Sequence, residues 1–171
     1  ATSHIPVAQH ADLDKDLSDK TPGPQGEFRG RHPLPTKDVF IQTLRTWGVN
    51  QDSQVVIYDA HGGMFAARLW WLLRCLGHND VAVLDGGIQH WQKNGYLLTT
   101  TLPKQQSGAF RPYLNTTNWL HALKVQNSMA RKSICLIDAR TPERYRGEQE
   151  PIDPIAGHIP NALNRPFQLN L

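Results

Sequence analysis

The residues "VVIYDAHGGMFAARLWW" (Val55–Trp71) carry the clearest fold signal in this chain. It opens with four apolar residues after a polar segment, which is typical of a buried strand. The pair Gly62 and Gly63 marks a tight turn. From Met64 the sequence is apolar around most of a helical circumference as far as Gly77, so it predicts a buried helix with a glycine cap. A strand, a short turn and a helix in this order indicate an α/β domain.

The same alternation of strand and helix continues on both sides of this stretch. Downstream, "VAVLD" (81–85) predicts a second buried strand, and residues 88–95 predict a short helix. Upstream, residues 36–48 predict an amphipathic helix with Thr36 as its N-cap and Gly48 at its end. Because strands alternate with helices, we expect a parallel sheet that is covered by helices on both faces.

A short string occurs twice in the chain, as "SHIPVA" (3–8) and as "GHIPNA" (157–162). The second copy follows a predicted strand, "SICLIDAR" (133–140), and a helical turn, "TPERYRG" (141–147). No such strand and helical turn precede the first copy. The chain therefore reads as the later part of one domain joined to the first part of its repeat.

This order of elements predicts three parts. Residues 1–98 form a first domain without its first strand, residues 99–112 form a polar linker, and residues 113–171 begin a second domain. The second domain is expected to open with a helix over 115–132 that has an asparagine or threonine cap.

Composition and charge exclude some classes of function. The 171 residues carry 18 basic and 15 acidic side chains, a net charge of +3 that is scattered along the sequence. Nucleic-acid-binding proteins concentrate basic residues on one face, so we expect no nucleic-acid partner, whereas a mildly basic chain suits a small anionic substrate. No apolar stretch reaches the ~20 residues of a membrane span and no signal peptide is evident, so we expect a cytoplasmic protein with no membrane partner.

The chain resembles the two-domain rhodanese family of thiosulfate and 3-mercaptopyruvate sulfurtransferases. The resemblance implies an α/β fold with a mostly parallel five-stranded sheet flanked by helices, in a tandem repeat of which both ends are incomplete here. The stretches that carry it occur in the family's order and spacing: "SHIPVA", "DLD", "SDKT", "RHPLP", "VVIYDAHGGMFAARLWW", "LDGG", "IDARTPERYRG" and "GHIPNA".

The resemblance also implies an activity. Such an enzyme takes sulfane sulfur from thiosulfate or 3-mercaptopyruvate onto a cysteine as a persulfide and passes it to cyanide or a thiol acceptor, with no cofactor or metal ion. In the family the reactive cysteine lies in a loop of the second repeat, which would fall after Leu171, so this chain alone is expected to be inactive. Cys75 and Cys135 do not match the reactive position, and because both lie in apolar runs we expect them to be buried and unreactive.

In the first repeat, Asp59 holds the position of the family's reactive cysteine. A carboxylate cannot carry a persulfide, and its charge repels an anionic donor. The first domain is therefore expected to be catalytically silent, with a plain turn where the family has its reactive loop. The degenerate loop consists of Asp59, Ala60, His61, Gly62 and Gly63.

Three residues match functional positions of the family. Arg144, in "RYRG", matches the arginine that contacts the anionic end of the donor, a task that suits a guanidinium fork; the alternative is a solvated surface arginine. Asp14 and His32 match an accessory Asp–His pair of the mercaptopyruvate enzymes, in which histidine suits proton transfer; the alternative is a structural histidine in a long loop. His4 and His158 are expected to be structural.

The interval Glu148–Ala156 contains three acidic residues and no arginine. In the mercaptopyruvate branch a second arginine lies there and helps to hold the donor's carboxylate, so we expect thiosulfate to be the preferred donor. The alternative function is a non-catalytic rhodanese-like binding or regulatory module whose second loop has also lost its cysteine. An incomplete sheet further predicts a strand-sharing partner, because its open edge and apolar face invite pairing.

Overall fold

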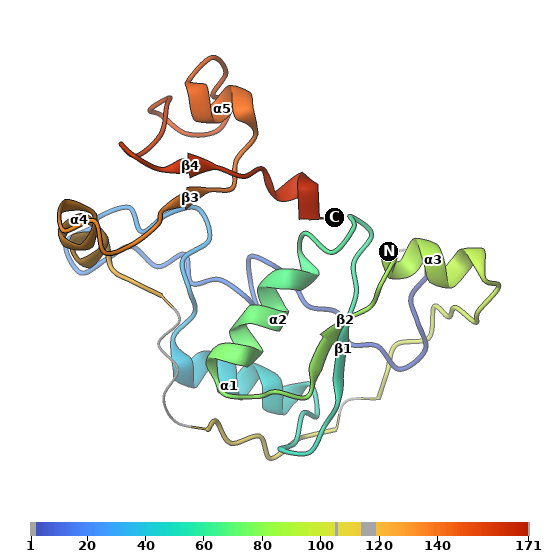
Figure 1. Cartoon of the computed structure of the whole chain (residues 1–171). Coiled ribbons are helices and arrows are strands. Elements are labelled where there is room, and N and C mark those ends of the chain that lie inside the picture. Colours follow the sequence, from blue (N-terminus) through green and yellow to red (C-terminus); the bar gives the residue numbers. More distant parts are fainter. Residues whose placement is uncertain (1–2, 105, 114–118, 171) are drawn as a thin grey trace. The chain divides into compact units, whose positions relative to one another are not determined.

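The computed structural model describes residues 3–104, 106–113 and 119–170. The chain divides into two units, Ala1–Thr116 and Thr117–Leu171, which are described separately below. Helices and parallel strands alternate in both units (Figure 1). The α/β class predicted from the sequence is therefore confirmed.

Unit 1 contains a strand–helix–strand motif and two further helices. Its elements are α1 (Lys37–Thr46), β1 (Val55–Ile57), α2 (Ala66–Cys75), β2 (Val81–Val83) and α3 (Gly87–Lys93). Strands β1 and β2 are parallel, with Val55 opposite Val81 and Ile57 opposite Val83. Helix α2 connects the two strands and packs against both (Figure 1). This is the motif that the sequence predicts.

Helix α1 begins and ends where its sequence signals lie. Oγ1 of Thr36 accepts a hydrogen bond from the backbone N–H of Val39 at 3.4 Å, which makes Thr36 the N-cap. Asp38 in the first turn and Arg45 in the last turn complement the helix dipole. Gly48, with a φ of +81°, takes the left-handed conformation that ends the helix.

The core of unit 1 is formed mainly by α1 and α2. Leu17, from the long loop before α1, and Phe110, from the segment after α3, complete it. The buried members are Leu17, Phe40, Ile41, Leu44, Ile57, Ala66, Leu69, Leu72, Leu73, Leu76 and Phe110.

The segment 99–112, which the sequence predicts as a linker, lies within unit 1, and part of it packs against the rest of that unit. His4 and Thr99 exchange two backbone hydrogen bonds of 2.9 Å. Phe110 is completely buried, and its carbonyl oxygen accepts a 3.0 Å hydrogen bond from Nε of Arg45. The segment is held because Phe110 fills the core, a long-range contact that local composition does not reveal.

Unit 2 contains a second pair of parallel strands. Its elements are α4 (Ala122–Ala130), β3 (Ile137–Asp138), α5 (Pro142–Arg146), β4 (Leu163–Asn164) and a 3₁₀ turn, η1 (Phe167–Asn170). Ile137 lies opposite Leu163, and Asp138 lies opposite Asn164. The asparagine or threonine cap predicted near residue 115 lies outside the described residues. Helix α4 follows His121, whose side chain makes no capping hydrogen bond.

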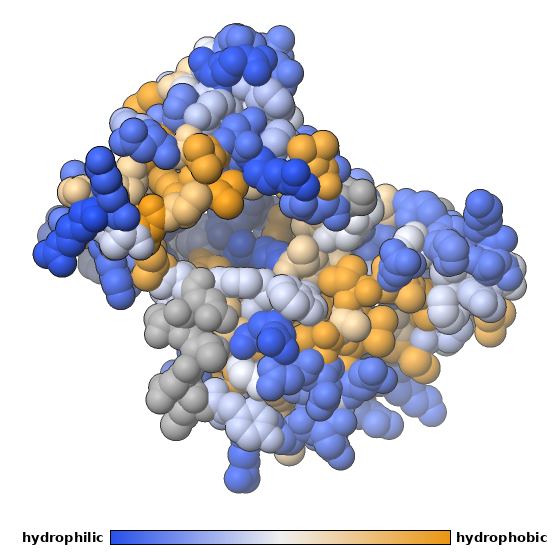
Figure 2. Space-filling view, in the orientation of Figure 1, coloured by the Kyte–Doolittle hydropathy of each residue, from blue (hydrophilic) through white to orange (hydrophobic). Residues whose placement is uncertain are grey.

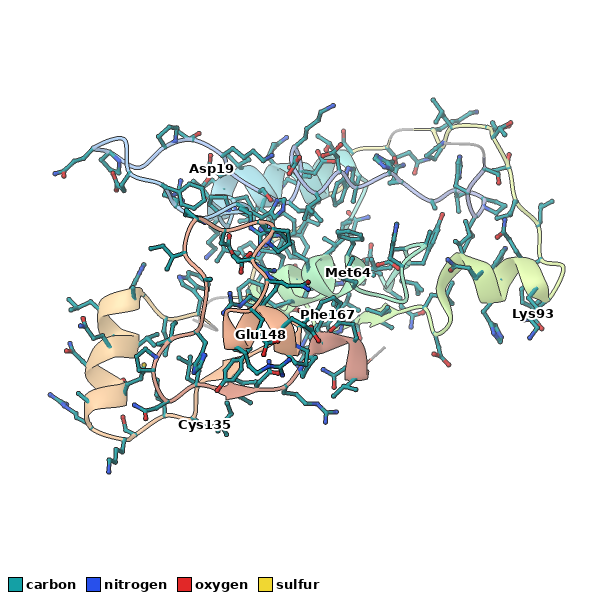
Figure 3. The ribbon with its side chains drawn as sticks, turned by 90° about the horizontal axis from the view of Figure 1, so that it is seen from above. Asp19, Met64, Lys93, Cys135, Glu148 and Phe167 are labelled. Carbon is teal, nitrogen blue, oxygen red and sulfur yellow. The ribbon has the colours of Figure 1, made fainter. Side chains whose placement is uncertain are left out.

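The prediction that both cysteines are buried is wrong. Cys75 is half-buried, and Cys135 is exposed on the connection between α4 and β3 (Figure 3). For Cys135 the reason is the short sheet of unit 2: β3 pairs only with β4 among the described residues, and Ile137 and Leu163 are 56% and 60% exposed. Hydrophobic surface is visible over these two strands in Figure 2.

The described residues hold two parallel strand pairs, β1–β2 and β3–β4. The five-stranded sheet and the tandem repeat implied by the resemblance stay predictions. No helix in the described part of the chain is both long and apolar enough to cross a membrane.

Candidate functional site

The loop between β1 and α2 is closed by its own carboxylate. Oδ1 of Asp59 accepts hydrogen bonds from the backbone N–H groups of His61 and Gly63, both at 2.8 Å. Oδ2 accepts from Phe65 at 2.8 Å and from Ala66 at 2.9 Å. Burial raises the pKa of Asp59, but these four hydrogen bonds outweigh burial and hold the pKa below its usual value. Four N–H groups that could bind an external anion are thus taken by Asp59.

The start of α3 packs against the same loop. The carbonyl oxygen of Asp59 accepts a 3.2 Å hydrogen bond from Ile88, and Nε2 of Gln89 donates to the carbonyl of Ala60 at 2.6 Å. Gly87 has a φ of +55°, and a Cβ atom added there would come within 2.6 Å of the Asp59 carbonyl oxygen. Only glycine fits this close approach to the Asp59 carbonyl. The hydrogen bonds from Ile88 and Gln89 hold the loop on the side of α3.

Asp14 and His32 lie in contact, although they are eighteen positions apart in the sequence. Oδ1 of Asp14 is 3.2 Å from Nδ1 of His32 and 2.9 Å from Nζ of Lys20. The neighbouring acids have other partners: Asp12 accepts from the N–H of Asp14, and Asp16 accepts from the N–H of Asp12. The structure therefore brings together the two residues that the sequence singles out.

In unit 2 two carboxylates hold the side chain of Arg144. Nε and Nη2 make a bidentate contact with Glu150 at 2.8–3.1 Å, and Nη2 also binds Oδ2 of Asp153 at 2.7 Å. Only 14% of the Arg144 side chain is exposed. Arg144 is therefore not a solvated surface arginine. Arg146, by contrast, is half-exposed and pairs with Glu148 beside α5 (Figure 3).

Glu150 is the centre of this network and is nearly buried, with 5% of its side chain exposed. Its carboxylate also accepts from Nη1 of Arg140 at 3.2 Å and from the backbone N–H groups of Ile152 and Asp153. The hydrogen bond from Arg144, reinforced by that from Asp153, lowers the pKa of Glu150 from its usual 4.5 to about 2. Glu150 therefore stays charged at neutral pH and fixes the orientation of the Arg144 guanidinium.

Comparison with known proteins assigns the family. Residues 1–94 match the family model described as "Rhodanese-like domain". The chain belongs to the rhodanese-like family. It is 45% identical over 170 residues to a probable 3-mercaptopyruvate sulfurtransferase of Pseudomonas aeruginosa, with 99% of this chain and 59% of the relative covered. It is 38% identical over 172 residues to a putative thiosulfate sulfurtransferase of Mycobacterium tuberculosis, with 95% and 56% covered.

A solved rhodanese structure agrees with this assignment. SseA from Escherichia coli, described with the rhodanese fold of 3-mercaptopyruvate sulfotransferases, matches the chain with a TM-score of 0.80 at 32% identity. The match covers 96% of this chain and 60% of SseA. The rhodanese-like chain thus spans a little over half the length of the curated relatives named above.

The two histidines of the repeated rhodanese string contact groups of their own unit. The ring of His158 stacks on Tyr145 with a centroid distance of 3.8 Å, and its Nδ1 lies 2.7 Å from the carbonyl oxygen of Tyr145. Nδ1 of His4 lies 2.9 Å from the carbonyl oxygen of Ile5. These contacts favour the structural role expected for both histidines.

Two residues of this rhodanese-like chain, Arg68 and Glu150, were not predicted from the sequence to be functionally important. Arg68 is the only Asp, Glu, Lys or Arg residue between Asp59 and Arg74, and a charge inside an apolar helix calls for polar partners. Glu150 lies six residues after Arg144 in an acidic loop. In the described part of the chain, no group of three or more His, Cys, Asp or Glu residues is arranged to hold a metal ion.

Proposed function

We propose that the protein containing this chain is a sulfurtransferase that carries sulfur on a cysteine outside residues 1–171. The cysteine thiolate attacks the sulfane sulfur of thiosulfate, an S–S bond forms on the cysteine, and sulfite leaves with the electron pair of the broken bond. Cyanide or a thiolate then attacks the outer sulfur of the persulfide, and the cysteine thiolate leaves. The sulfur moves without a cofactor, because the second step returns the cysteine to its starting state.

One observation carries this proposal: the likeness to relatives named as sulfurtransferases extends over 99% of the chain, at 45% identity in the first case. The aligned length includes both copies of the repeated string, at residues 3–8 and 157–162. The likeness is therefore not confined to residues 1–94, which the family model matches.

Arg144 is the proposed contact for the anionic donor. Its hydrogen bonds use Nε and Nη2, so among the described residues Nη1 keeps both of its N–H donors for an oxyanion. Because Glu150 already fixes the guanidinium plane, less conformational entropy is lost when an anion binds there. Glu150 and Asp153 also offset the charge of Arg144, so a dianion needs further donors, which we assign to the N–H groups of the reactive loop.

The domain assignment follows the sequence. Residues 1–98 are proposed as the non-catalytic domain, 99–112 as the linker and 113–171 as the start of the catalytic domain. The four N–H groups bound by Asp59 support the silent role of the first domain. A cytoplasmic location is part of the proposal, since thiol acceptors are kept reduced there.

Thiosulfate is the proposed preferred donor. The interval Glu148–Ala156 offers no second guanidinium for the carboxylate and keto group of 3-mercaptopyruvate. Its three acids are paired, two with Arg144 and one with Arg146. The measurement is kcat/KM for both donors on the full-length protein. A tenfold or greater advantage for 3-mercaptopyruvate would overturn this choice.

The Asp14–His32 contact is the proposed accessory pair. A carboxylate at 3.2 Å orients the imidazole ring, and an oriented histidine can move a proton to or from a leaving group or an acceptor thiol. The pair belongs to unit 1.

Substitution of Arg144 tests the donor site directly. In the full-length protein, Arg144→Ala should lower kcat/KM for thiosulfate roughly 30- to 150-fold, equivalent to about 2–3 kcal/mol of transition-state binding. Arg146→Ala is the matched control on the same helix, because Arg146 is half-exposed and bound to Glu148, and its kinetics should not change. Unchanged kinetics in Arg144→Ala would remove Arg144 from the donor site.

Measuring sulfur transfer by the full-length protein also distinguishes the enzyme from the non-catalytic binding module. The hydrogen bonds that Asp59 accepts in its loop support the proposal that unit 1 has a rhodanese-like loop without a cysteine. A full-length protein that has no cysteine after the next strand of unit 2, and that forms no thiocyanate from either donor, would be the binding module instead.

A further inference from the structure

Arg68 binds the long loop that carries Asp14 and His32. This residue lies in the first turn of α2, where Asp59 binds the preceding N–H groups of Phe65 and Ala66. Its backbone position is therefore fixed. Its guanidinium leaves the helix, and its Nε and Nη2 lie within hydrogen-bond distance of four oxygens of the 12–35 loop, all of them neutral.

These hydrogen bonds reach both arms of the 12–35 loop. On the first arm, Nε and Nη2 donate to the carbonyl of Leu17 at 3.0 and 2.7 Å, and Nη2 lies 3.4 Å from Oγ of Ser18. On the second arm, Nη2 donates to the carbonyls of His32 at 2.9 Å and Pro33 at 3.3 Å. One side chain thus joins two segments that are fifteen residues apart in the sequence.

Each arm is coupled to one member of the Asp14–His32 pair. Ser18 is buried, and its Oγ donates to the carbonyl of Leu13, next to Asp14, at 2.7 Å. The carbonyl of His32 itself accepts from Arg68. The residues between the two arms are mostly exposed and rich in glycine and proline. Besides Arg68, a 3.0 Å hydrogen bond from the backbone N–H of Asp19 to the carbonyl of Pro33 joins the two arms.

We propose that Arg68 is a positioning residue that holds His32 against Asp14. The inference rests on the accessory role proposed for that pair, and it assigns the geometry of the pair to a residue on another element. Arg68 does this without contacting the side chain of either one. A planar guanidinium can donate to several carbonyls in fixed directions at once, whereas a lysine ammonium is a compact charge with no fixed fork.

The first experiment measures the contact between the two side chains by NMR in the full-length protein. The ring C–H signal of His32, assigned with a His32→Gln variant, is recorded with and without Asp14→Asn. In the parent protein Asp14→Asn should shift this signal. In the Arg68→Lys background the shift should be lost, because His32 no longer lies against residue 14. An equal shift in both backgrounds would overturn the proposal.

Arg74→Lys is the matched control for this experiment. Arg74 lies on the same helix, is exposed, and stacks over Trp70 at 5.9 Å from the ring centroid. The shift caused by Asp14→Asn should survive in this background, and its loss would show that any change of α2 disturbs the pair. If Arg68→Lys fails to fold, Ser18→Ala takes its place, since it removes the Ser18–Leu13 bond without changing α2, and the same loss is expected.

The second experiment separates positioning from simple stabilisation by kinetics. Arg68→Lys should lower kcat roughly tenfold, a partial loss of the roughly 10²- to 10⁴-fold that general acid–base catalysis contributes, and leave KM for the donor unchanged. Because Arg68 acts through His32, Arg68→Lys should add no further loss to His32→Ala. If the double variant Arg68→Lys/His32→Ala loses kcat by the product of the two single losses, Arg68 does not act through His32 and the positioning role is wrong.

The two experiments also separate this inference from the proposed function. If His32→Ala leaves kcat unchanged, the accessory role of the pair is wrong, while the NMR shift still shows whether Arg68 holds the contact. If the NMR coupling survives in Arg68→Lys, the positioning role is wrong whatever the kinetics show.

Discussion

At the scale of single residues, Asp59 in unit 1 and Glu150 in unit 2 have similar structural roles. Asp59 accepts four backbone N–H groups. Glu150 accepts two backbone N–H groups and the guanidinium groups of Arg140 and Arg144. Both carboxyl groups have a pKa below its usual value because these hydrogen bonds favour the charged form. Each loop therefore depends on a charged carboxylate.

Asp59→Asn tests this dependence in unit 1. An amide offers one oxygen, and its NH₂ group cannot accept from the N–H groups of Phe65 and Ala66. We expect a loss of about 2 kcal/mol in the free energy of unfolding, measured by urea denaturation of the full-length protein. Asp52→Asn, at an exposed position, is the control and should change stability by less than about 0.5 kcal/mol. Equal stability of the two variants would contradict this account of the loop.

Glu150 predicts a dependence of stability on pH. A carboxyl group whose pKa is lower in the folded state stabilises the fold while it is charged. For Glu150 this contribution is complete above pH 4.5 and is lost as the pH falls toward 2. Glu150→Gln should lower the Tm at neutral pH and flatten the decline of Tm over this acid range.

Glu148→Gln is the matched variant for the pH experiment. Glu148 is half-exposed and pairs with Arg146, so its substitution should change the acid decline much less. Identical pH profiles for Glu150→Gln and the parent protein would show that the Glu150 network does not stabilise the folded state.

At the scale of elements, the turn between β2 and α3 is constrained by its approach to Asp59. Gly87→Ala would place a Cβ atom 2.6 Å from the Asp59 carbonyl oxygen, whereas Gly95 has a φ of +72° and open space around it. Both alanines bear the cost of the left-handed conformation, about 1–2 kcal/mol. Gly87→Ala should cost at least about 1 kcal/mol more, because the loop must move. Similar unfolding free energies for the two variants would contradict the close approach.

Elements with strong local signals were predictable from the sequence. The Thr36 cap, the glycine at 48 and the apolar run of Val55–Trp71 act within a few residues, and the structure has α1, β1 and α2 at these places. The length of β3 was not predictable, because strand extent depends on pairing with neighbours rather than on propensity. The exposure of Cys135 follows from the same cause.

In the candidate site, too, some features were predictable from the sequence and others were not. Arg144, Asp14 and His32 could be found from motifs, because each lies in a short recognisable string. Their supporting partners could not be predicted as contacts. The bonds from Arg68 to the 12–35 loop and from Glu150 to Arg144 form only when irregular loops fold back, and no periodicity marks such contacts.

At the scale of the whole chain, both strand pairs present apolar residues to solvent (Figure 2). Val56 on β1 is 51% exposed, and Val83 on β2 is also exposed. In the described residues β1 pairs only with β2 and β3 only with β4, so the outer edges of both pairs have no strand beside them. Open edges and apolar faces together favour pairing with another chain.

We therefore expect residues 1–171, produced alone, to self-associate or to take up a strand from a partner. Sedimentation should show species larger than a monomer, and Val56→Lys, which places a charge on the exposed face, should shift the distribution toward monomer. A monomer with full amide protection along residues 55–59 would contradict this expectation.

We propose sulfur transfer through a cysteine outside residues 1–171, with unit 1 silent and Arg144 binding the donor. The most direct measurement is mass spectrometry of peptides from the full-length protein after treatment with thiosulfate. We expect one added sulfur atom on a cysteine outside residues 1–171, in smaller amount in Arg144→Ala and removed by cyanide. An added sulfur on Cys75 or Cys135, or no persulfide on any cysteine, would contradict it.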